Sequence, residues 1–364
     1  MSKLLTIDKN RNTVVKDLLK YLIEKELVSG VFTLRKINDS GSHDYAFTTK
    51  VKNLDTIDPF YPIMPLQAGQ TLSGFTPMEK PIAVVIRPCE FRAFVEMAKR
   101  AQGNMKNFLF ITHTCGGVIP LKDHALGKAA GQIDEYWKTV EKGEIHDGVR
   151  ANCKACEHFA PMNADILISV INEDSKNTKL YLNTDKAVKL TEGFDGNSTN
   201  DKFDASILDP LMEKRLKEKE ALFASIDITD KGLDGMVDIF GKCIGCHGCN
   251  SVCPICYCTQ CDFTSSNFDY NTPILEKELE QKGALRLPPD TIFFQLGRMS
   301  HMAYSCVGCG QCTDVCPASI PVGPMFNKSG EQVAKAFDFV PGRDVEEQIP
   351  VMIFKEQEFP EMGA

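Results

Sequence analysis

The sequence predicts two unlike domains and a tail: an α/β domain with a parallel βαβ unit over residues 1–237, a smaller cysteine-rich domain over residues 238–330, and an acidic tail over residues 331–364. Three observations support this division. The 364 residues are too many for one ordinary core. The stretch IAVVIRP, EFRAFVEMAKRA, NFLFITHT reads as strand, helix and strand. From about residue 238 the chain becomes rich in Cys, Gly and Pro.

Apolar periodicity predicts the elements of the first domain. Residues 11–28 carry apolar side chains at helical spacing, and GVFTLRKI has the composition of a strand. A loop punctuated by Pro and Gly follows over roughly residues 52–79. The strand–helix–strand stretch after it implies a parallel sheet with a right-handed crossover. ILISVI and KLYLN are further expected strands, and a charged helix over roughly residues 206–225 closes the domain.

Composition and charge exclude several classes of function. The net charge is −8 and no basic run occurs, so the sequence argues against nucleic-acid binding. The start, MSKLLTIDKN, lacks the features of a secretory signal. No apolar run reaches the roughly 18 residues needed to span a bilayer. We therefore expect a soluble cytoplasmic protein without direct membrane insertion.

Cysteine is the most informative residue type in this chain. There are 15 cysteines, an odd number, and 11 of them lie between Cys243 and Cys316. In a reducing compartment, structural disulfides are rare and clustered cysteines usually bind metal. The sequence therefore predicts metal centres in the second domain.

Two copies of the spacing C-x2-C-x2-C-x3-C-P define these centres. Three thiolates in one tight turn each take a different iron of a cubane, and the fourth cysteine points away to the other cluster. The expected ligands of one [4Fe–4S] cluster are Cys243, Cys246, Cys249 and Cys316, and those of the other are Cys306, Cys309, Cys312 and Cys253. Zinc is the alternative, but zinc sites usually pair two separated C-x2-C knuckles. Two full copies of the four-cysteine spacing favour iron–sulfur clusters.

The 52 residues between the two motifs exceed what a compact two-cluster ferredoxin needs. Within them, DTIFFQLGRMSHMAYS has Phe293, Leu296, Met299 and Met302 at helical spacing. We expect a helix that packs behind the clusters, with the methionines as core residues rather than ligands. The second domain is thus predicted to be a helical-type two-[4Fe–4S] ferredoxin domain.

Three more thiols follow the first motif, at Cys256, Cys258 and Cys261. They could hold part of a further cluster, replace a cysteine of the motif, or have no ligand role. Three ligands without a fourth make an incomplete site, so the sequence leaves these alternatives open.

The four remaining cysteines lie in the first domain, at Cys89, Cys115, Cys153 and Cys156. Cys89 and Cys115 each follow a strand of the βαβ unit, and ligands gather beyond the carboxyl ends of parallel strands. Since adjacent strands lie about 4.8 Å apart, these two thiols could face one cofactor, with the C-x2-C pair completing the site. The alternatives are small buried hydrophobic side chains, a redox disulfide or half a zinc site.

Several stretches of the chain resemble a known family. RPCEFRAFVEMAKR, ITHTCGG and ANCKACEHFAPMNADILI resemble the β subunits of coenzyme F420-reducing hydrogenases and formate dehydrogenases. KCIGCHGCNSVCPICYCTQC and FFQLGRMSHMAYSCVGCGQCTDVCPASIPV are more similar to the formate dehydrogenase branch. The similarity extends from about residue 80 to about residue 325.

The resemblance implies an electron-relaying subunit that partners a Mo or W formate dehydrogenase catalytic subunit or a hydrogenase. It further implies assemblies with heterodisulfide-reductase-like subunits, and it supports a third [4Fe–4S] cluster at the four cysteines of the first domain. One departure concerns FAD. Family members that bind it usually have a Gly-Gly loop before their first helix, whereas this chain reads TIDKNRNTVVKDLLKY there.

The sequence therefore leaves two redox functions open, besides a structural metal-binding scaffold. The first is an electron relay through several [4Fe–4S] clusters, with no catalytic residue of its own. The second is a subunit with FAD that oxidises or reduces F420 or NAD(P)H. Gly116-Gly117 after a strand is a weak indication of a flavin site.

Overall fold

The computed structural model of the chain describes residues 2–38, 41–161, 163–173, 175–228, 231–266, 272–283 and 291–353. The strands are β1 (Lys3–Ile7), β2 (Gly30–Lys36), β3 (His43–Thr48), β4 (Ile82–Val85), β5 (Phe108–His113), β6 (Ile166–Ser169), β7 (Thr178–Leu182) and β8 (Asn197–Thr199). The helices of the first domain are α1 (Arg11–Glu24), α2 (Ala68–Ser73), α3 (Pro88–Ala98), α4 (Leu121–Ala125), α5 (Ile133–Val140), α6 (Ala151–Lys154), α7 (Asp185–Leu190) and α8 (Asp209–Ser225). They are followed by α9 (Gly232–Phe240), α10 (Gly248–Ser251), α11 (Thr272–Lys282), α12 (Thr291–Met302), α13 (Gln311–Asp314) and α14 (Val322–Phe337).

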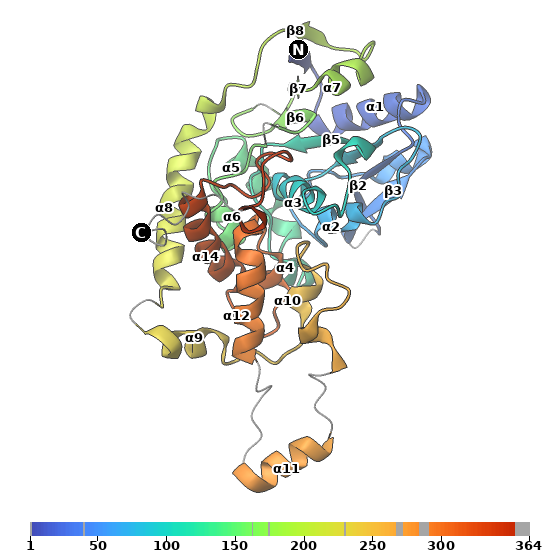
Figure 1. The fold of residues 1–364 in the computed structure, drawn as a ribbon. Helices are drawn as coiled ribbons and strands as arrows, with labels where there is room; N and C mark the ends of the chain where they lie inside the picture. The colour runs from blue at the N-terminus through green and yellow to red at the C-terminus, as the bar shows by residue number, and fades with distance from the viewer. Residues whose placement is uncertain are drawn as a thin grey trace, which may run out of the picture.

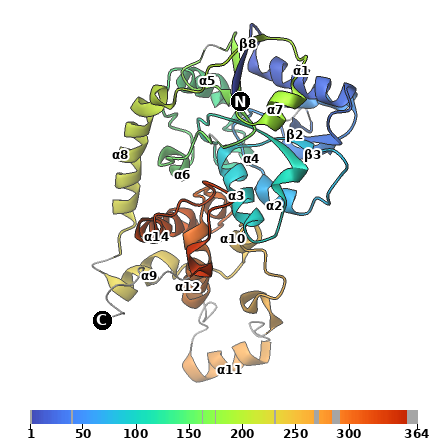
Figure 2. The same cartoon turned by 45° about the horizontal axis from the view of Figure 1, so that its top comes forward.

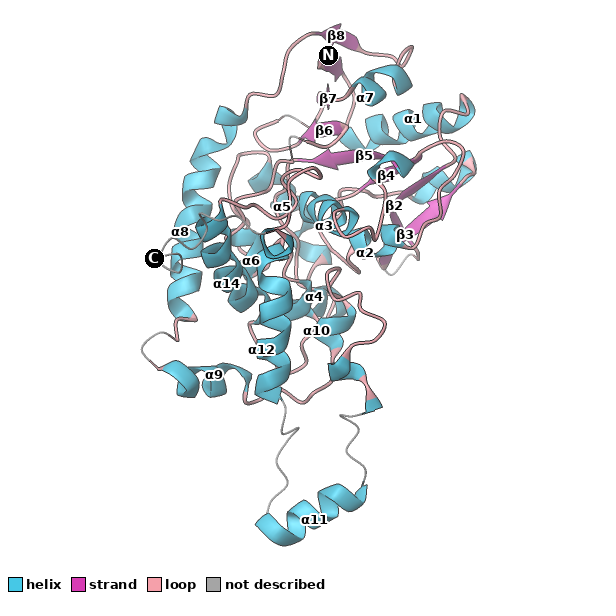
Figure 3. Cartoon of the chain, viewed as in Figure 1, coloured by secondary structure: helices cyan, strands magenta, loops and turns pink. Residues whose placement is uncertain are grey.

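The strands form one mixed sheet, with the order β3-β2-β4-β5-β6-β7-β1-β8. Its centre is parallel, because β2, β4, β5 and β6 pair in the same direction. The strands on either side pair antiparallel. Figure 3 shows the strands gathered in one half of the molecule and a mainly helical half beside them. The α/β class expected from the sequence is confirmed.

Both faces of the parallel centre are covered by helices. On β4 and β5, alternate side chains point to opposite faces, as the pleat requires. Ala83, Val85, Leu109 and Ile111 share a core with α1, whereas Ile82, Val84, Phe108 and Phe110 share a core with α2 and α3. A strand buried on both faces must be apolar throughout, which explains the continuous run IAVV in β4.

Helix α3 connects β4 to β5, which is its parallel neighbour in the sheet. The helix starts at Pro88, whose fixed backbone suits the first helical position. The carboxylate of Glu90 accepts a hydrogen bond of 2.7 Å from the backbone N–H of Arg87. This cap holds Cys89 in the first turn, at the carboxyl end of β4.

The helical half is organised around α9, α12 and α14. Their buried side chains share a core that also includes Cys243 and Cys249, and Met97 of α3 joins it from the first domain. Helix α8 runs along both halves (Figures 1 and 2). Among the described residues, no helix has the length and apolar character that crossing a membrane requires.

Several expected boundaries differ from the observed ones. Helix α1 ends at Glu24 rather than at residue 28, because the chain turns at Glu26, whose φ is 52°. The expected loop over residues 52–79 contains α2, and α8 begins only at Asp209, after a 3₁₀ turn. The division at residues 237 and 330 stays a prediction, and α9 and α14 run through these positions.

Candidate metal centres

The first cysteine cavity is walled by Cys243, Cys246, Cys249 and Cys316. Three of these thiols come from the first motif, and Cys316 comes from the second. The remaining wall is mainly apolar, with side chains such as Phe294, Ile320 and Val322. The structure therefore brings together the four cysteines that the spacing assigns to one site.

The second cysteine cavity is walled by Cys306, Cys309, Cys312 and Cys253. Here the second motif supplies three thiols, and Cys253 crosses over from the first. Each motif turns through a left-handed residue just before its short helix, His247 before α10 and Gly310 before α13. The two motifs thus have the same local geometry and exchange their fourth cysteines.

Close approach explains the glycine before α13. A Cβ built on Gly310 would lie 2.9 Å from the Cβ of Asn152 in α6. A side chain at this position would push the second motif away from the first domain. Gly310 therefore lets the second cysteine cavity lie against the segment that carries Cys153 and Cys156.

Two buried arginines fix the second motif to the first domain. Arg150, just before α6, donates to the carbonyl of Cys309 at 3.1 Å and forms an ion pair with Asp314. Arg92 of α3 donates to the carbonyls of Val307 at 3.2 Å and Pro341 at 2.5 Å. These bonds set the position of the second cysteine cavity relative to α3 and α6.

The third group of thiols lies at the edge of the sheet that the sequence predicts. Cys89 follows β4 and Cys115 follows β5, while Cys153 and Cys156 belong to α6 and the turn after it. Three of these thiols, Cys89, Cys115 and Cys153, lie within electrostatic reach of one another. Burial raises the pKa of Cys89, and negative charge on Cys309, Cys115 and Cys153 raises it further. Cys153 is in turn affected by Cys156.

Arg215 of α8 connects the two halves of this third group. Its side chain is 1% exposed and donates to the carbonyl of Cys115 at 2.9 Å and to that of Cys156 at 3.3 Å. The guanidinium also lies 4.2 Å from the centre of the Phe159 ring. Arg215 therefore holds the loop after β5 against the turn after α6.

Burial controls the protonation of most of these thiols. It raises the pKa of Cys306 to about 12 and, together with the charge of Cys153, that of Cys115 to about 11. Such thiols keep their protons at neutral pH unless a cation compensates the thiolate charge. Iron ions provide that charge when they bind. The donor set and its burial fit clusters that bind with release of protons.

The three extra thiols do not form a comparable group. Cys256 lies within hydrogen-bond distance of Cys253 and 3.4 Å from the sulfur of Met302. Cys258 is exposed, and Cys261 is half-buried. Within the described part of the chain, no three Cys, His, Asp or Glu side chains lie close enough to hold a single metal ion.

Helix α12 differs from its expected orientation. Phe293 is 69% exposed and Leu296 is 38% exposed, so these two members of the predicted face point to solvent. The two methionines lie in the core as predicted, since Met302 is buried and Met299 packs against the same cluster. The other buried side chains are Phe294, Gln295 and Arg298, together with Thr291 at the start of the helix. The polar residues of this face explain why it is buried, because they contact cysteines. Arg298 donates to the sulfur of Cys249 at 3.0 Å, and Gln295 lies 3.7 Å from that of Cys243.

The sequence did not predict these polar contacts or the buried positions of Arg92, Arg150 and Arg215. A signal existed for Arg92, which is three residues after Cys89 and so lies one helical turn from a predicted ligand. For Arg298, the signal was a cation within an otherwise apolar helix. Neither pattern alone distinguishes a buried arginine from an exposed one.

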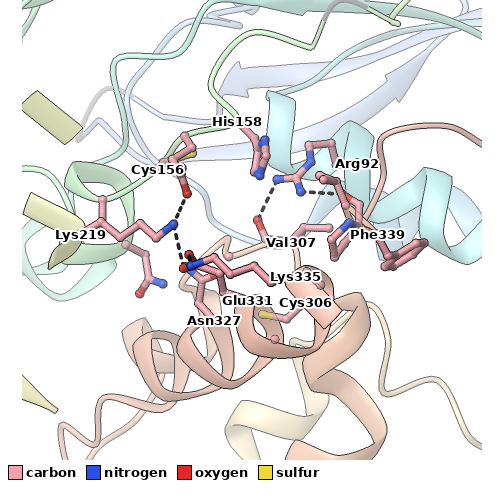
Figure 4. Close-up of a pocket in the computed structure, with 18 of the residues that line it drawn as sticks. Arg92, Cys156, His158, Lys219, Cys306, Val307, Asn327, Glu331, Lys335 and Phe339 are labelled. Carbon is pink, nitrogen blue, oxygen red and sulfur yellow. Dashed lines mark hydrogen bonds and ion pairs between the residues drawn. The ribbon is translucent and has the colours of Figure 1, made fainter. Parts of the chain in front are cut away.

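An open pocket of about 1,120 Å³ lies between the third group of thiols and the second cysteine cavity (Figure 4). Cys156 and Cys306 line it, and so do the cations Arg92, Lys219 and Lys335. The cations already have partners. Lys219 pairs with Glu157 and Glu331, and Lys335 pairs with Glu331 at 2.8 Å. The pocket therefore carries a nearly balanced set of charges.

Known proteins are similar in sequence to both halves of the chain. Residues 239–320 match the 4Fe-4S dicluster domain family. The F420-dependent formate dehydrogenase 1 subunit beta of Methanococcus maripaludis is 32% identical over 370 residues, which cover 90% of this chain and 90% of that protein. The F420-dependent formate dehydrogenase subunit beta of Methanocaldococcus jannaschii is 26% identical over 365 residues with the same coverage.

One solved structure also matches part of the chain. A chain of the xenon-derivatised F420-reducing [NiFe] hydrogenase complex from Methanosarcina barkeri superposes with a TM-score of 0.43 at 12% identity, covering 62% of this chain and 90% of that chain. The full-length similarity to the two formate dehydrogenase subunits and the dicluster match make this an iron–sulfur electron-transfer subunit. The chain belongs to the coenzyme F420 hydrogenase/formate dehydrogenase β-subunit family, in its formate dehydrogenase branch.

Proposed function

We propose that this chain relays single electrons through three [4Fe–4S] clusters within a multisubunit redox complex. The first cluster is held in the first cysteine cavity by Cys243, Cys246, Cys249 and Cys316. The second is held in the second cysteine cavity by Cys306, Cys309, Cys312 and Cys253. The third is held by Cys89, Cys115, Cys153 and Cys156.

One observation carries this proposal. Each of two cavities is walled by three cysteines of one motif and the fourth cysteine of the other. Cross-ligation of this kind is typical of two-cluster ferredoxins. Each bound cluster exchanges one electron at a time at a potential that its surroundings set.

The three sites form a series. The first and second cavities exchange a cysteine in each direction, so they are direct neighbours. The second cavity is next to the third group, because Gly310 packs against Asn152, the residue before Cys153, and Arg150 donates to the carbonyl of Cys309. Arg92 and Arg150 hold these two sites in place. Electrons therefore have a continuous route between the two halves of the molecule.

The partners follow from the family. Its relatives are named as subunits of F420-dependent formate dehydrogenases. We propose a Mo or W formate dehydrogenase catalytic subunit, or a hydrogenase, at one end of the series. Heterodisulfide-reductase-like subunits are the proposed partners at the other end. Cys246 is exposed, so the first site reaches the surface at one of these ends.

We propose no fourth cluster. Cys256 lies against Cys253, so it is an alternative ligand for the second cluster rather than part of a new site. Cys258 is exposed and Cys261 is half-buried, and neither lines either cysteine cavity as formed by the described residues.

The alternative function is a subunit that binds FAD and reacts with F420 or NAD(P)H. The pocket between Cys156 and Cys306 favours it, since a flavin ring there would adjoin two cluster sites. Two observations favour the relay. Both lysines of the pocket are already paired with Glu331, and Asn10, not a glycine, precedes α1. Stoichiometric flavin in the purified chain would establish the alternative.

Ligand substitutions test the relay site by site. Cys89→Ala should lower the iron content by about four per chain, as one cubane is lost. Cys309→Ala should remove the second cluster and interrupt electron flow between the partners. Iron content measured anaerobically, with activity of the assembled complex, checks both. Unchanged iron in Cys89→Ala would remove the third site from the proposal.

A further inference from the structure

Arg298 is a buried cation between the two cysteine cavities. Its residue exposure is 3%, and its guanidinium lies 5.0 Å from the ring centre of Phe326 and 5.5 Å from that of Phe294. A buried charge is costly unless an opposite charge and hydrogen bonds compensate it. Among the described residues, no carboxylate forms an ion pair with Arg298. Its compensation must come from the cysteine sites.

The contacts of the guanidinium reach both cavities. Nη1 donates to the sulfur of Cys249 at 3.0 Å, and Nη2 donates to the carbonyl of the same residue at 3.1 Å. Cys249 is a wall residue of the first cavity, whereas Arg298 itself lines the second. Nε is buried and has no hydrogen-bond partner within the described part of the chain. The guanidinium also forms a hydrogen bond with Cys256, which lies against Cys253 of the second cavity.

We propose that Arg298 is a positioning residue that holds the Cys249 thiolate and raises the reduction potentials of the two clusters in the cysteine cavities, the first more than the second. This inference rests on the relay function proposed above. The electron that reduces a cluster adds one negative charge. A fixed cation hydrogen-bonded to a ligand sulfur stabilises that charge, and low local polarity strengthens the effect.

The electron transfer that Arg298 favours involves no proton. An arginine side chain keeps its proton throughout the physiological range, so it gives none to the reduced site. The partner subunit supplies one electron, the cluster gains one negative charge, and Arg298 stays a cation. A histidine or lysine in the same place could couple reduction to protonation, but Arg298 does not.

The test compares midpoint potentials of the holoprotein with those of two Arg298 variants. Arg298→Met removes the charge at similar length, and Arg298→Lys keeps the charge but loses the two-point hydrogen bonding. Lys242→Met is the matched control, because Lys242 is next to Cys243 in sequence but is exposed. Redox titration monitored by electron paramagnetic resonance reports each cluster, with Cys246→Ser assigning the signal of the first.

We expect Arg298→Met to retain its iron and to favour the oxidised first cluster at least tenfold, which is about 59 mV for one electron. The change in this redox equilibrium should be smaller for Arg298→Lys, and smaller for the second cluster than for the first. For Lys242→Met it should be below about threefold. Full iron with unchanged potentials in Arg298→Met would overturn the inference. Absence of [4Fe–4S] signals in the wild type would instead contradict the relay function itself.

A measurement on the unmutated protein covers the case in which the variants do not assemble. In protein labelled with ¹⁵N-arginine, the reduced first cluster should show a ¹⁵N hyperfine coupling from the guanidinium at Cys249. A spectrum identical to that of unlabelled protein would contradict the contact. The measurement decides, without a substitution, whether the contact on which the inference depends exists.

Discussion

At the scale of single residues, the thiols and the arginines of this protein depend on each other. Burial raises the pKa of Cys306 to about 12, so its thiolate is unfavourable without compensating charge. Arg298 contacts the sulfur of Cys249, and Arg215 and Arg150 donate to carbonyls of Cys115 and Cys309. Cations near the cysteines therefore reduce the negative charge that each assembled cluster would carry.

Because the motifs exchange a cysteine, we predict that a substitution in one motif removes the cluster of the other. Cys316→Ala should remove about four irons and the first cluster, although Cys316 belongs to the second motif. Cys258→Ala is the control, because exposed Cys258 lies outside both cavities and its loss should leave iron unchanged. Mössbauer spectroscopy of the anaerobic protein reports both. Loss of the second cluster in Cys316→Ala, with the first intact, would contradict the exchange.

The sequence predicts ligands better than it predicts their surroundings. Spacing predicts which cysteines share a cavity, because the local turn dictates where each thiol points. The buried face of α12 was only partly predicted. Phe293 and Leu296 are apolar, but the helix instead buries Arg298 and Gln295, whose side chains contact cysteine sulfur atoms. Hydrophobic periodicity does not reveal hydrogen bonds to sulfur atoms that are far away in the sequence.

At the scale of elements, the turn before α6 and the short helix α13 form the main joint between the domains. Arg150→Met should lower the free energy of unfolding by about 3–5 kcal/mol, because it leaves the buried carboxylate of Asp314 unpaired. Adding Asp314→Asn should recover part of the loss. Lys154→Met is the control, since its partner Asp147 is fully exposed and the pair should contribute below about 1 kcal/mol.

Urea denaturation of the three variants measures these differences. Equal stability of Arg150→Met and Lys154→Met would show that the ion pair of Arg150 does not hold the joint.

A second joint, between α8 and α14, should depend on pH. Burial raises the pKa of Glu331, but Lys219 and Lys335 outweigh it and hold the pKa below its usual value of 4.5. The carboxylate therefore stabilises the fold above that value, and the contribution is lost as pH falls through the lowered pKa. Glu331→Gln should cost up to about 1 kcal/mol at pH 7, given partial exposure.

The measurement for this joint is the difference in urea midpoint between wild type and Glu331→Gln at pH 7 and at pH 4. The difference should shrink on acidification. A difference that is independent of pH would mean that Glu331 stabilises the helices by packing rather than by its charge.

The elements themselves were only partly predictable. The apolar runs IAVV and ILIS predict buried strands because burial on both faces demands them. Helix α2, within the expected loop, carries Gly69, whose Cβ would lie 2.6 Å from the carbonyl of Glu90. A helix that needs glycine to pack against α3 gives a weak helical signal. Tertiary packing determines such elements more than local propensity does.

At the scale of the whole molecule, the fold places three groups of thiols one after another in space, from the helical half to the sheet. Helix α8 spans both halves and anchors the third group through Arg215 (Figure 2). This arrangement suits a chain that connects two partners. The site between the halves was not visible in the sequence, because the pocket walls come from α6, α8 and α14, which are distant along the chain.

The most direct test of the three-cluster relay is the quantification of iron, acid-labile sulfide, zinc and flavin in the full chain, purified anaerobically. The relay predicts about 12 irons and as many sulfides per chain, with no flavin. About eight irons would leave the four cysteines of the first domain without a cluster. Stoichiometric FAD, or zinc in place of iron, would contradict the relay as proposed.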